Sequence, residues 1–183
     1  MLQEKSLVVF SHEPNISLIE AISPFGVKVL TVAKNQSPIQ TVAQAYRSSK
    51  SDESLLVTEQ LPLLKPNVVL ALFEFARNND AAIPKWSNGK IEPLIAVYRK
   101  NAFTRIISSQ KKESIGTNLV TEIQRVAEQL FDVKFVSVEE DLMELDPELD
   151  SLFQVKDERS LQAARERASI KKTRKTQIKR AAK

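Results

Sequence analysis

Residues Asp80 to Lys100, DAAIPKWSNGKIEPLIAVYRK, are the stretch that decides the fold. It holds the only tryptophan of the chain, Trp86, and two short apolar runs separated by a turn. Short apolar runs bounded by turn residues are typical of buried strands, so residues 81–84 and 94–98 predict two strands. Between them, Ser87-Asn88-Gly89 predicts a reversal in which the glycine takes a positive φ. A pair of strands with a packed indole is one sufficient explanation of this stretch.

The rest of the chain predicts strands and helices in alternation, which is typical of a mostly parallel sheet with helical crossovers. We expect a domain over residues 1–168 and a basic tail over residues 169–183. Asn67 is expected to cap the helix that begins there. The loop 59–66 follows a strand and is therefore a candidate site wall, because ligands bind beyond the carboxyl ends of such strands. The further predicted strands are 6–10, 27–32, 55–58, 133–138 and 150–155, and the predicted helices are 16–22, 38–47, 67–78, 102–108, 117–130 and one from 157 onward.

Composition excludes several kinds of site. The 183 residues are 42% hydrophobic and 27% charged and contain no cysteine, which excludes disulfides, a thiolate nucleophile and a cysteine-bound metal. The single histidine, His12, is interpreted as an ordinary surface residue. With only three glycines, at 26, 89 and 116, the chain shows no glycine-rich phosphate loop. No apolar run approaches the roughly 20 residues of a membrane span, so we expect a soluble, cytoplasmic protein without a membrane partner.

Charge is distributed unevenly along the chain. Nine Lys or Arg and one acid lie between Arg165 and Lys183, a net charge of +8, so the rest of the chain carries −4 although the total is +4. The tail is either a solubilising helix extension or a polyanion-binding segment, and nucleic acid is expected to bind only through Lys171–Lys183. Residues 139–150 contain seven acids and no base. We interpret them as a solvated linker rather than a cation site, held to the body by Leu142, Met143, Leu145 and Leu149.

The stretch from Asp80 to Lys100 resembles a signature of the MobA-like nucleotidyltransferases, the molybdenum cofactor guanylyltransferases. Ser37-Pro38-Ile39 is similar to the family's Gly-Pro-Leu, residues 55–66 to its strand followed by Asp-Met-Pro-Leu, and residues 152–161 to its closing Phe-Phe-Asn-Val-Asn-Thr-Pro-Glu-Asp-Leu. The resemblance spans roughly residues 5 to 168. It implies a Rossmann-like α/β fold that binds GTP and Mg²⁺ and transfers GMP to molybdopterin. It places the acceptor-side surface at Lys85, Trp86, Asn88, Glu92, Pro93, Leu94 and Tyr98.

Several positions depart from the family pattern. The family's Leu-Ala-Gly-Gly-x-Ser-x-Arg-Met-Gly phosphate loop and first strand have no counterpart in these residues. Its metal-binding Asp corresponds to Gln60, beside Glu59, and Ser37 replaces its glycine. Gln154 and Lys156 replace its closing asparagines. Since the family's first strand lies between the strands represented by residues 6–10 and 55–58, we expect those two strands to pair directly or another segment or subunit to fill the gap.

Three hypotheses follow. The first is a degenerate guanylyltransferase-like protein, a pseudoenzyme with no catalytic residue or metal ligand assigned, that binds a ligand or a partner such as an active paralogue, a molybdoenzyme or a second copy. The second is an active nucleotidyltransferase with a misassigned start or with Glu59 as metal ligand. The third is nucleic-acid binding through the tail.

Overall fold

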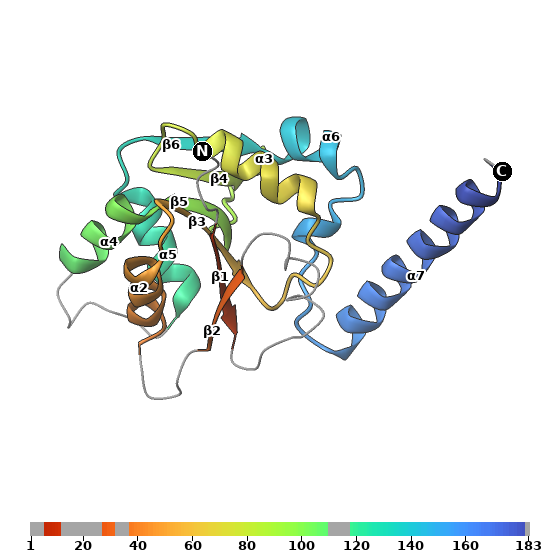
Figure 1. Cartoon of the computed structure of the whole chain (residues 1–183), viewed down its shortest axis with the longest axis horizontal. Helices are drawn as coiled ribbons and strands as arrows, with labels where there is room; N and C mark the ends of the chain where they lie inside the picture. Colours follow the sequence, from red (N-terminus) through yellow and green to blue (C-terminus); the bar gives the residue numbers. More distant parts are fainter. Residues whose placement is uncertain (1–5, 12–26, 32–36, 110–117, 182–183) are drawn as a thin grey trace.

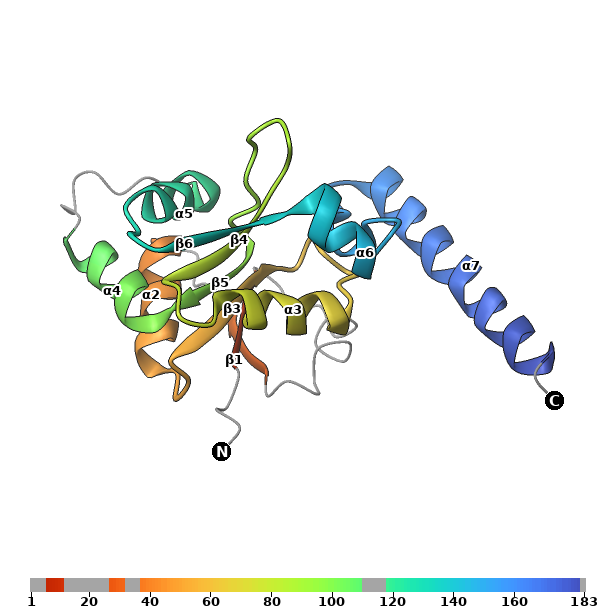
Figure 2. The same ribbon diagram turned by 90° about the horizontal axis from the view of Figure 1, so that it is seen from above.

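The computed structural model describes residues 6–11, 27–31, 37–109 and 118–181. These residues form a six-stranded sheet with the order β2-β1-β3-β5-β4-β6, covered by helices on both faces (Figures 1 and 2). All neighbouring strands are parallel except at β5, which runs antiparallel to both β3 and β4. The expected mostly parallel α/β sheet is confirmed. The strands are β1 (Ser6–Ser11), β2 (Val27–Thr31), β3 (Glu53–Thr58), β4 (Ala81–Lys85), β5 (Ile95–Arg99) and β6 (Val133–Ser137).

The helices fall close to where the apolar spacing predicts them. The expected helix at 38–47 is confirmed, with Ile39, Val42 and Tyr46 buried along one face. The predicted helix at 16–22, the loop at 111–116 and His12 lie outside the described residues. The helices are α2 (Pro38–Ser48), α3 (Pro66–Ala76), α4 (Lys100–Ser109), α5 (Leu119–Glu128), α6 (Met143–Leu145) and α7 (Glu158–Ala181), with a π-helical turn η3 (Val138–Leu142) and a 3₁₀ turn η4 (Asp150–Leu152).

Strands β1 and β3 pair directly with each other. They are parallel neighbours in continuous register, with Leu7 opposite Leu55 and Val9 opposite Val57. This confirms the first of the two arrangements expected for these strands. The pairing satisfies backbone groups that an open slot would leave without partners.

The sheet carries a hydrophobic core on each face because side chains alternate along each strand. One core joins α2, α4 and α5 to the strand residues Leu56, Ile83 and Tyr98. The other joins α3 and the segment after β6 to Leu55 and Val57. Both cores are built mainly from fully buried aliphatic side chains and leave the two ends of the sheet for polar residues.

Helix α3 differs in its start from the prediction. Pro66 occupies its first turn and Lys65 stands at the N-cap, so Asn67 is not the cap. Proline suits this position because the first amide of a helix has no partner within the helix. The Asn67 amide instead donates to the carbonyl of Leu145 at 2.8 Å, which ties α3 to α6. Of the residues on its inner face, Phe75 is only half-buried, whereas Phe73 is buried.

The acidic segment 139–150 is not a solvated linker. It folds into η3 and α6, and two of its acids, Asp146 and Asp150, are buried at 1% and 0% exposure. Leu142 is buried as expected, whereas Met143 is 40% exposed. The expected strand at 150–155 is also wrong, because η4 begins there. The Asp146 carboxylate accepts the Ser151 amide, which holds this chain segment away from a strand ladder.

Helix α7 starts after Asp157 as expected. The Asp157 carboxylate accepts the Ser160 amide at 2.8 Å, and the Ser160 hydroxyl accepts the Asp157 amide in return. These bonds cap the first turn. The Ser160 hydroxyl, which also donates to the Asp157 carboxylate at 2.6 Å, and the Ser160 amide hold the pKa of Asp157 below its usual value. The helix continues to Ala181 and projects away from the sheet and its covering helices (Figures 1 and 2). The division of the chain at residue 168 stays a prediction.

Candidate functional site at the carboxyl edge of the sheet

The carboxyl ends of β3, β4 and β6 meet at one edge of the sheet. These three strands share a direction, because β3 and β4 are both antiparallel to β5 and β4 is parallel to β6. The turn 86–90, the loop 59–66 and the segment 138–155 all follow these strand ends. In open α/β sheets, ligands bind beyond the carboxyl ends of strands. This edge is therefore the candidate site on topology.

The turn after β4 forms as the sequence predicts. The Gly89 amide donates to the carbonyl of Trp86 at 2.8 Å, and the Trp86 amide donates to the carbonyl of Lys90 at 2.8 Å. Gly89 has φ +88°, and a Cβ atom there would meet nothing within 4 Å. The backbone conformation, and not lack of space, therefore requires the glycine. The amide of Lys90 donates to the Asn88 side chain, so Asn88 serves the turn itself.

Trp86 is oriented by a buried carboxylate. Its indole Nε1 donates to Glu92 Oε1 at 2.9 Å, and Lys90 Nζ donates to the same oxygen at 2.6 Å. Glu92 is only 9% exposed, so these bonds offset the cost of burying its charge. The Trp86 ring packs against the core on the α3 side of the sheet. The sequence interpretation of a packed indole is correct, and Glu92 holds that indole beside the strand end.

The same turn is fixed from the other side by Glu139. Ser87 donates to the Glu139 carboxylate through its amide, at 3.1 and 3.2 Å, and through its hydroxyl, at 2.9 Å. These bonds favour the charged form and hold the pKa of Glu139 below its usual value. Sequence reasoning missed this contact because the two residues lie far apart in the chain and only the pairing of β4 with β6 brings them together.

Lys85 is one of the residues that line a hollow at this edge. Its ammonium group stands 4.7 Å from the ring centroid of Phe135. The hollow has a volume of about 260 Å³. Within the part of the chain that the structure describes, no acid forms an ion pair with Lys85. The neighbouring acids Glu92 and Glu139 are already held by other donors. The hollow is lined by Lys85, Trp86, Ser87, Phe135 and Ser137.

Phe135 and Ser137 were missed by sequence reasoning. Both lie on β6, and Phe135 keeps 45% of its surface exposed. The alternation in Val133-Lys134-Phe135 would place Phe135 on the buried face with Val133, so the local pattern gave no signal for its exposure. The sequence alone does not show that β6 pairs with β4. This parallel pairing places Ile83 opposite Phe135 and Lys85 opposite Ser137.

Tyr98 does not reach the predicted surface. It is fully buried, its hydroxyl donates to the carbonyl of Pro93 at 2.9 Å, and burial raises its pKa well above the ordinary value. Pro93 is likewise buried, and Leu94 packs against the core that includes α2. These three residues therefore support the start of β5. Lys85, Trp86 and Asn88 form the accessible part of the predicted set, and the buried Glu92 orients Trp86.

The positions that depart from the family pattern fall in two places. The Val155 amide donates to the carbonyl of Gln60 at 2.8 Å, so the loop after β3 runs beside Gln154 and Lys156, which flank Val155. Gln60 is exposed. Ser37 stands at the N-cap of α2 without using its side chain as a cap.

The family's metal position is occupied by the neutral amide of Gln60. Within the described ranges, no three Asp, Glu, His or Cys side chains gather closely enough to hold a metal ion. Magnesium in nucleotide sites is commonly held by one or two carboxylates, with phosphate and water oxygens as its other ligands. Glu59, the acid beside Gln60, is half-buried and already engaged in an interaction, so we assign no magnesium ligand to this loop.

A buried ionic cluster lies beside this edge and joins three chain segments. Lys65 Nζ contacts Asp146 Oδ1 and lies 3.4 Å from Asp150 Oδ2. Arg167 of α7 donates to Asp150 Oδ1 at 3.0 Å and stacks on the ring of Phe153 at 4.5 Å. The cluster therefore fastens the loop after β3, the 146–153 segment and α7 to one another.

The charge state of Asp146 follows from its partners. Burial alone would raise the pKa of Asp146, but the hydrogen bond and charge of Lys65, with the amide and hydroxyl of Ser151, outweigh it and hold the pKa below the usual value. The Ser151 amide lies 2.7 Å from Asp146 Oδ2, and the Ser151 hydroxyl accepts the Lys65 amide at 3.0 Å. Asp146 is therefore a charged structural group and not a candidate proton donor.

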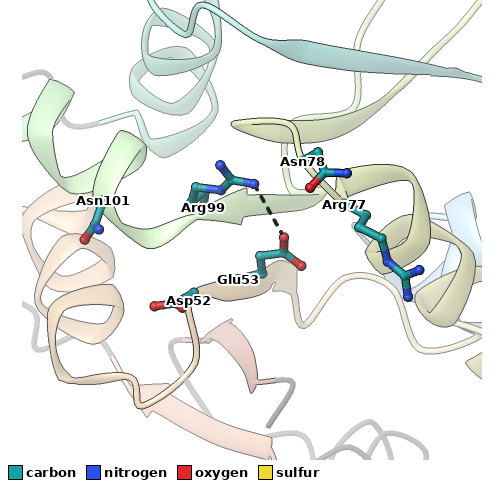
Figure 3. A pocket seen from close by; sticks show the side chains of 6 residues that line it. All are labelled: Asp52, Glu53, Arg77, Asn78, Arg99 and Asn101. Atoms are coloured by element: carbon teal, nitrogen blue, oxygen red, sulfur yellow. Dashed lines mark ion pairs between the residues drawn. The ribbon is translucent and has the colours of Figure 1, made fainter. Parts of the chain in front are cut away.

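A second cavity, of about 320 Å³, lies at the opposite edge of the sheet (Figure 3). Its arginines form ion pairs with nearby acids: Arg99 lies 3.9 Å from Glu53, and Arg77 lies 2.9 Å from Glu74. Such a charge-balanced surface offers no excess charge of either sign to a ligand. The lining residues are Asp52, Glu53, Arg77, Asn78, Arg99 and Asn101.

None of the helices that the structure describes is long and apolar enough to cross a membrane.

Comparison with known sequences agrees with the resemblance. The model of the MobA-like NTP transferase domain matches residues 2–136. A probable molybdenum cofactor guanylyltransferase of Methanosarcina mazei is 34% identical over 116 residues, which cover 63% of this chain and 49% of the relative. One of Flavobacterium johnsoniae is 24% identical over 153 residues, covering 73% and 79%. The chain thus spans about half the length of the Methanosarcina relatives that it matches.

Solved structures show the same fold. Molybdopterin-guanine dinucleotide biosynthesis protein A from Archaeoglobus fulgidus superposes with a TM-score of 0.72 at 20% identity, covering 90% of this chain and 98% of that one. The 2-C-methyl-D-erythritol 4-phosphate cytidylyltransferase of Thermus thermophilus gives 0.60 at 11% identity, covering 88% and 98%. These similarities establish a Rossmann-like nucleotidyltransferase fold. Together with the family match over most of the sequence, they show that this chain belongs to the MobA-like NTP transferase domain family.

Proposed function

We propose that this chain does not transfer GMP on its own and that it binds the acceptor of the family reaction, molybdopterin, at the carboxyl-edge hollow. Its role is then to hold or present that ligand to a partner, such as an active paralogue or a molybdoenzyme. The observation that carries the proposal is Lys85. It is a cation with no acidic partner among the described residues, at the sheet edge where this fold binds ligands.

The hollow suits a phosphate attached to a ring system. The Lys85 ammonium offers up to three hydrogen-bond donors to an anion, and Phe135 offers a half-exposed ring face beside it. Glu92 fixes the indole of Trp86 at one side, and Glu139 fixes Ser87 at another. These contacts hold the hollow in one shape before a ligand arrives, which lowers the entropy lost on binding.

Two observations support the absence of transfer. GMP transfer in this family depends on a metal, and the neutral Gln60 stands at the family's metal position. The described residues also contain no glycine-rich phosphate loop, and their one glycine, Gly89, lies in the turn after β4. Our second hypothesis, an active nucleotidyltransferase, requires other residues to supply the metal ligand and the phosphate loop.

Trp86 makes binding measurable in the protein itself. It is the only tryptophan, so its emission reports on the hollow without background from the rest of the chain. We expect anaerobic titration with molybdopterin to change this emission saturably. Lys85→Gln should weaken binding about tenfold, because a hydrogen bond to a charged group contributes about 1.5 kcal/mol or more. Lys50→Gln, which removes the same charge at an exposed site on the loop before β3, should change the affinity less than about twofold.

Two outcomes would count against the binding half of this proposal. One is an emission of wild-type Trp86 that stays constant while molybdopterin is added to saturation. The other is an equal loss of affinity in Lys85→Gln and Lys50→Gln, which would mean that net charge and not the hollow attracts the ligand.

A further inference from the structure

Helix α7 is anchored to the body through its first half. Ala164 is buried, and Arg167 binds Asp150 and stacks on Phe153. The backbone then continues as helix to Ala181, away from the sheet (Figures 1 and 2). From Arg165 to Ala181 this is about 25 Å of helix. The backbone of this length lies apart from the sheet and from the helices that cover it (Figures 1 and 2).

The charges on this projecting helix are almost all positive. Nine of the Lys and Arg residues and one acid fall between Arg165 and Lys183. Lys171, Lys175 and Lys179 follow one another at intervals of four residues, which is about one helical turn. Like charges at this spacing repel one another and weaken a helix. An anionic partner with evenly repeated charges would turn this repulsion into attraction.

We propose that α7 beyond Arg167 is a docking segment for the phosphate backbone of a nucleic acid duplex. A duplex carries about one negative charge per 1.7 Å of its axis, so the length of α7 can span many phosphates. Residues 157–183 contain no aromatic side chain. Stacking on unpaired bases is thereby excluded as the source of affinity, which favours the duplex over a single strand.

The charge of the rest of the chain favours contact between the duplex and α7 alone, and not with the whole protein surface. It carries a net charge of −4, and the acidic segment 139–150 lies beside the start of α7. These charges repel a nucleic acid from the body. A duplex is therefore expected to engage only the projecting part of the helix and to leave the hollow at Lys85 accessible.

The test compares two variants of equal net charge in the full-length chain. The tail variant carries Lys171→Gln, Lys175→Gln and Lys179→Gln, and the control carries Lys50→Gln, Arg105→Gln and Lys134→Gln at exposed sites of the body. The probe is a fluorescein-labelled DNA duplex of about two helical turns, followed by anisotropy between about 50 and 200 mM salt. Circular dichroism should show helix content at least equal to wild type in the tail variant, because the substitutions remove like-charge repulsion along α7; it should show unchanged helix content in the control.

We expect the tail variant to bind at least tenfold more weakly than wild type and the slope of log affinity against log salt to fall by about 2 to 3, since each lost phosphate contact contributes about 0.9. The control should stay within about twofold. Equal losses in the two variants, or no binding by wild type, would overturn the proposal. It would also be overturned by tail-dependent binding to phosphatidylserine vesicles without duplex binding, or by tail-dependent dimerisation without duplex binding.

Discussion

Replacing Lys65 with methionine is expected to lower the free energy of unfolding by about 3 kcal/mol. The reason is that Lys65 is the cation shared by Asp146 and Asp150, which are buried at 1% and 0% exposure. Asp150 would keep Arg167, whereas Asp146 would keep only its hydrogen bonds to Ser151. A buried carboxylate without a counter-charge lowers the free energy of unfolding by much more than a surface ion pair raises it. Urea unfolding followed by circular dichroism measures the effect.

The pH dependence separates this cause from lost packing. In wild type the lowered pKa of Asp146 gives stability that is present above the ordinary value of 3.8 and is lost as the pH falls through the lowered pKa. Without Lys65, burial dominates and the pKa rises, so the variant gains stability as the pH falls from neutral. The stability deficit should therefore shrink on acidification. Arg77→Met, at an exposed pair with Glu74, should cost less than about 1 kcal/mol. A deficit for Lys65→Met that is small, or that stays constant with pH, would contradict this description.

Replacing Phe103 with alanine is expected to cost about 4 kcal/mol. Phe103 is fully buried, stacks on Tyr46 with ring centroids 4.4 Å apart and meets Tyr98 at 5.1 Å. The substitution leaves a cavity between α2, α4 and β5 that rigid neighbours fill poorly. It should also loosen Tyr98, whose hydroxyl binds the carbonyl of Pro93 beside the hollow.

The matched control is Phe131→Ala. Phe131 is 90% exposed, so the same change of residue should alter the free energy of unfolding by less than about 0.5 kcal/mol. Urea midpoints of both variants give the comparison directly. If Phe131→Ala costs as much as Phe103→Ala, then the core assigned to this face of the sheet is wrong.

Local pattern was enough for most elements of the fold. The apolar runs at 81–84 and 55–58 and the helical spacing of 38–47 agree with β4, β3 and α2, because burial on one face leaves a periodic signal in the sequence. Positive φ at Gly89 was also predictable, since turn residues carry their own signature. The direct pairing of β1 with β3 followed from the need to satisfy backbone groups once the family's first strand had no counterpart.

Features that depend on distant residues were not predictable. The acids at 146 and 150 lie in a run that a local interpretation assigns to solvent, and only contacts with Lys65 and Arg167 bury them. Phe135 joins the hollow only because β6 pairs with β4. Asn67 has the chemistry of a cap, yet Pro66 occupies the first turn and shifts the helix start. In the first two cases tertiary contact overrides local preference, whereas Pro66 is a local helix-start signal that the interpretation of Asn67 as the cap overlooked.

The most direct test of the central claim is a transfer assay with the full chain. The purified protein is incubated with molybdopterin, Mg²⁺ and GTP labelled in its α-phosphate, with an active guanylyltransferase of the same family run in parallel. We predict labelled molybdopterin product from the active relative and none above the protein-free blank from this chain. Transfer of labelled GMP at a rate proportional to the concentration of this protein would contradict the claim and would establish an active nucleotidyltransferase.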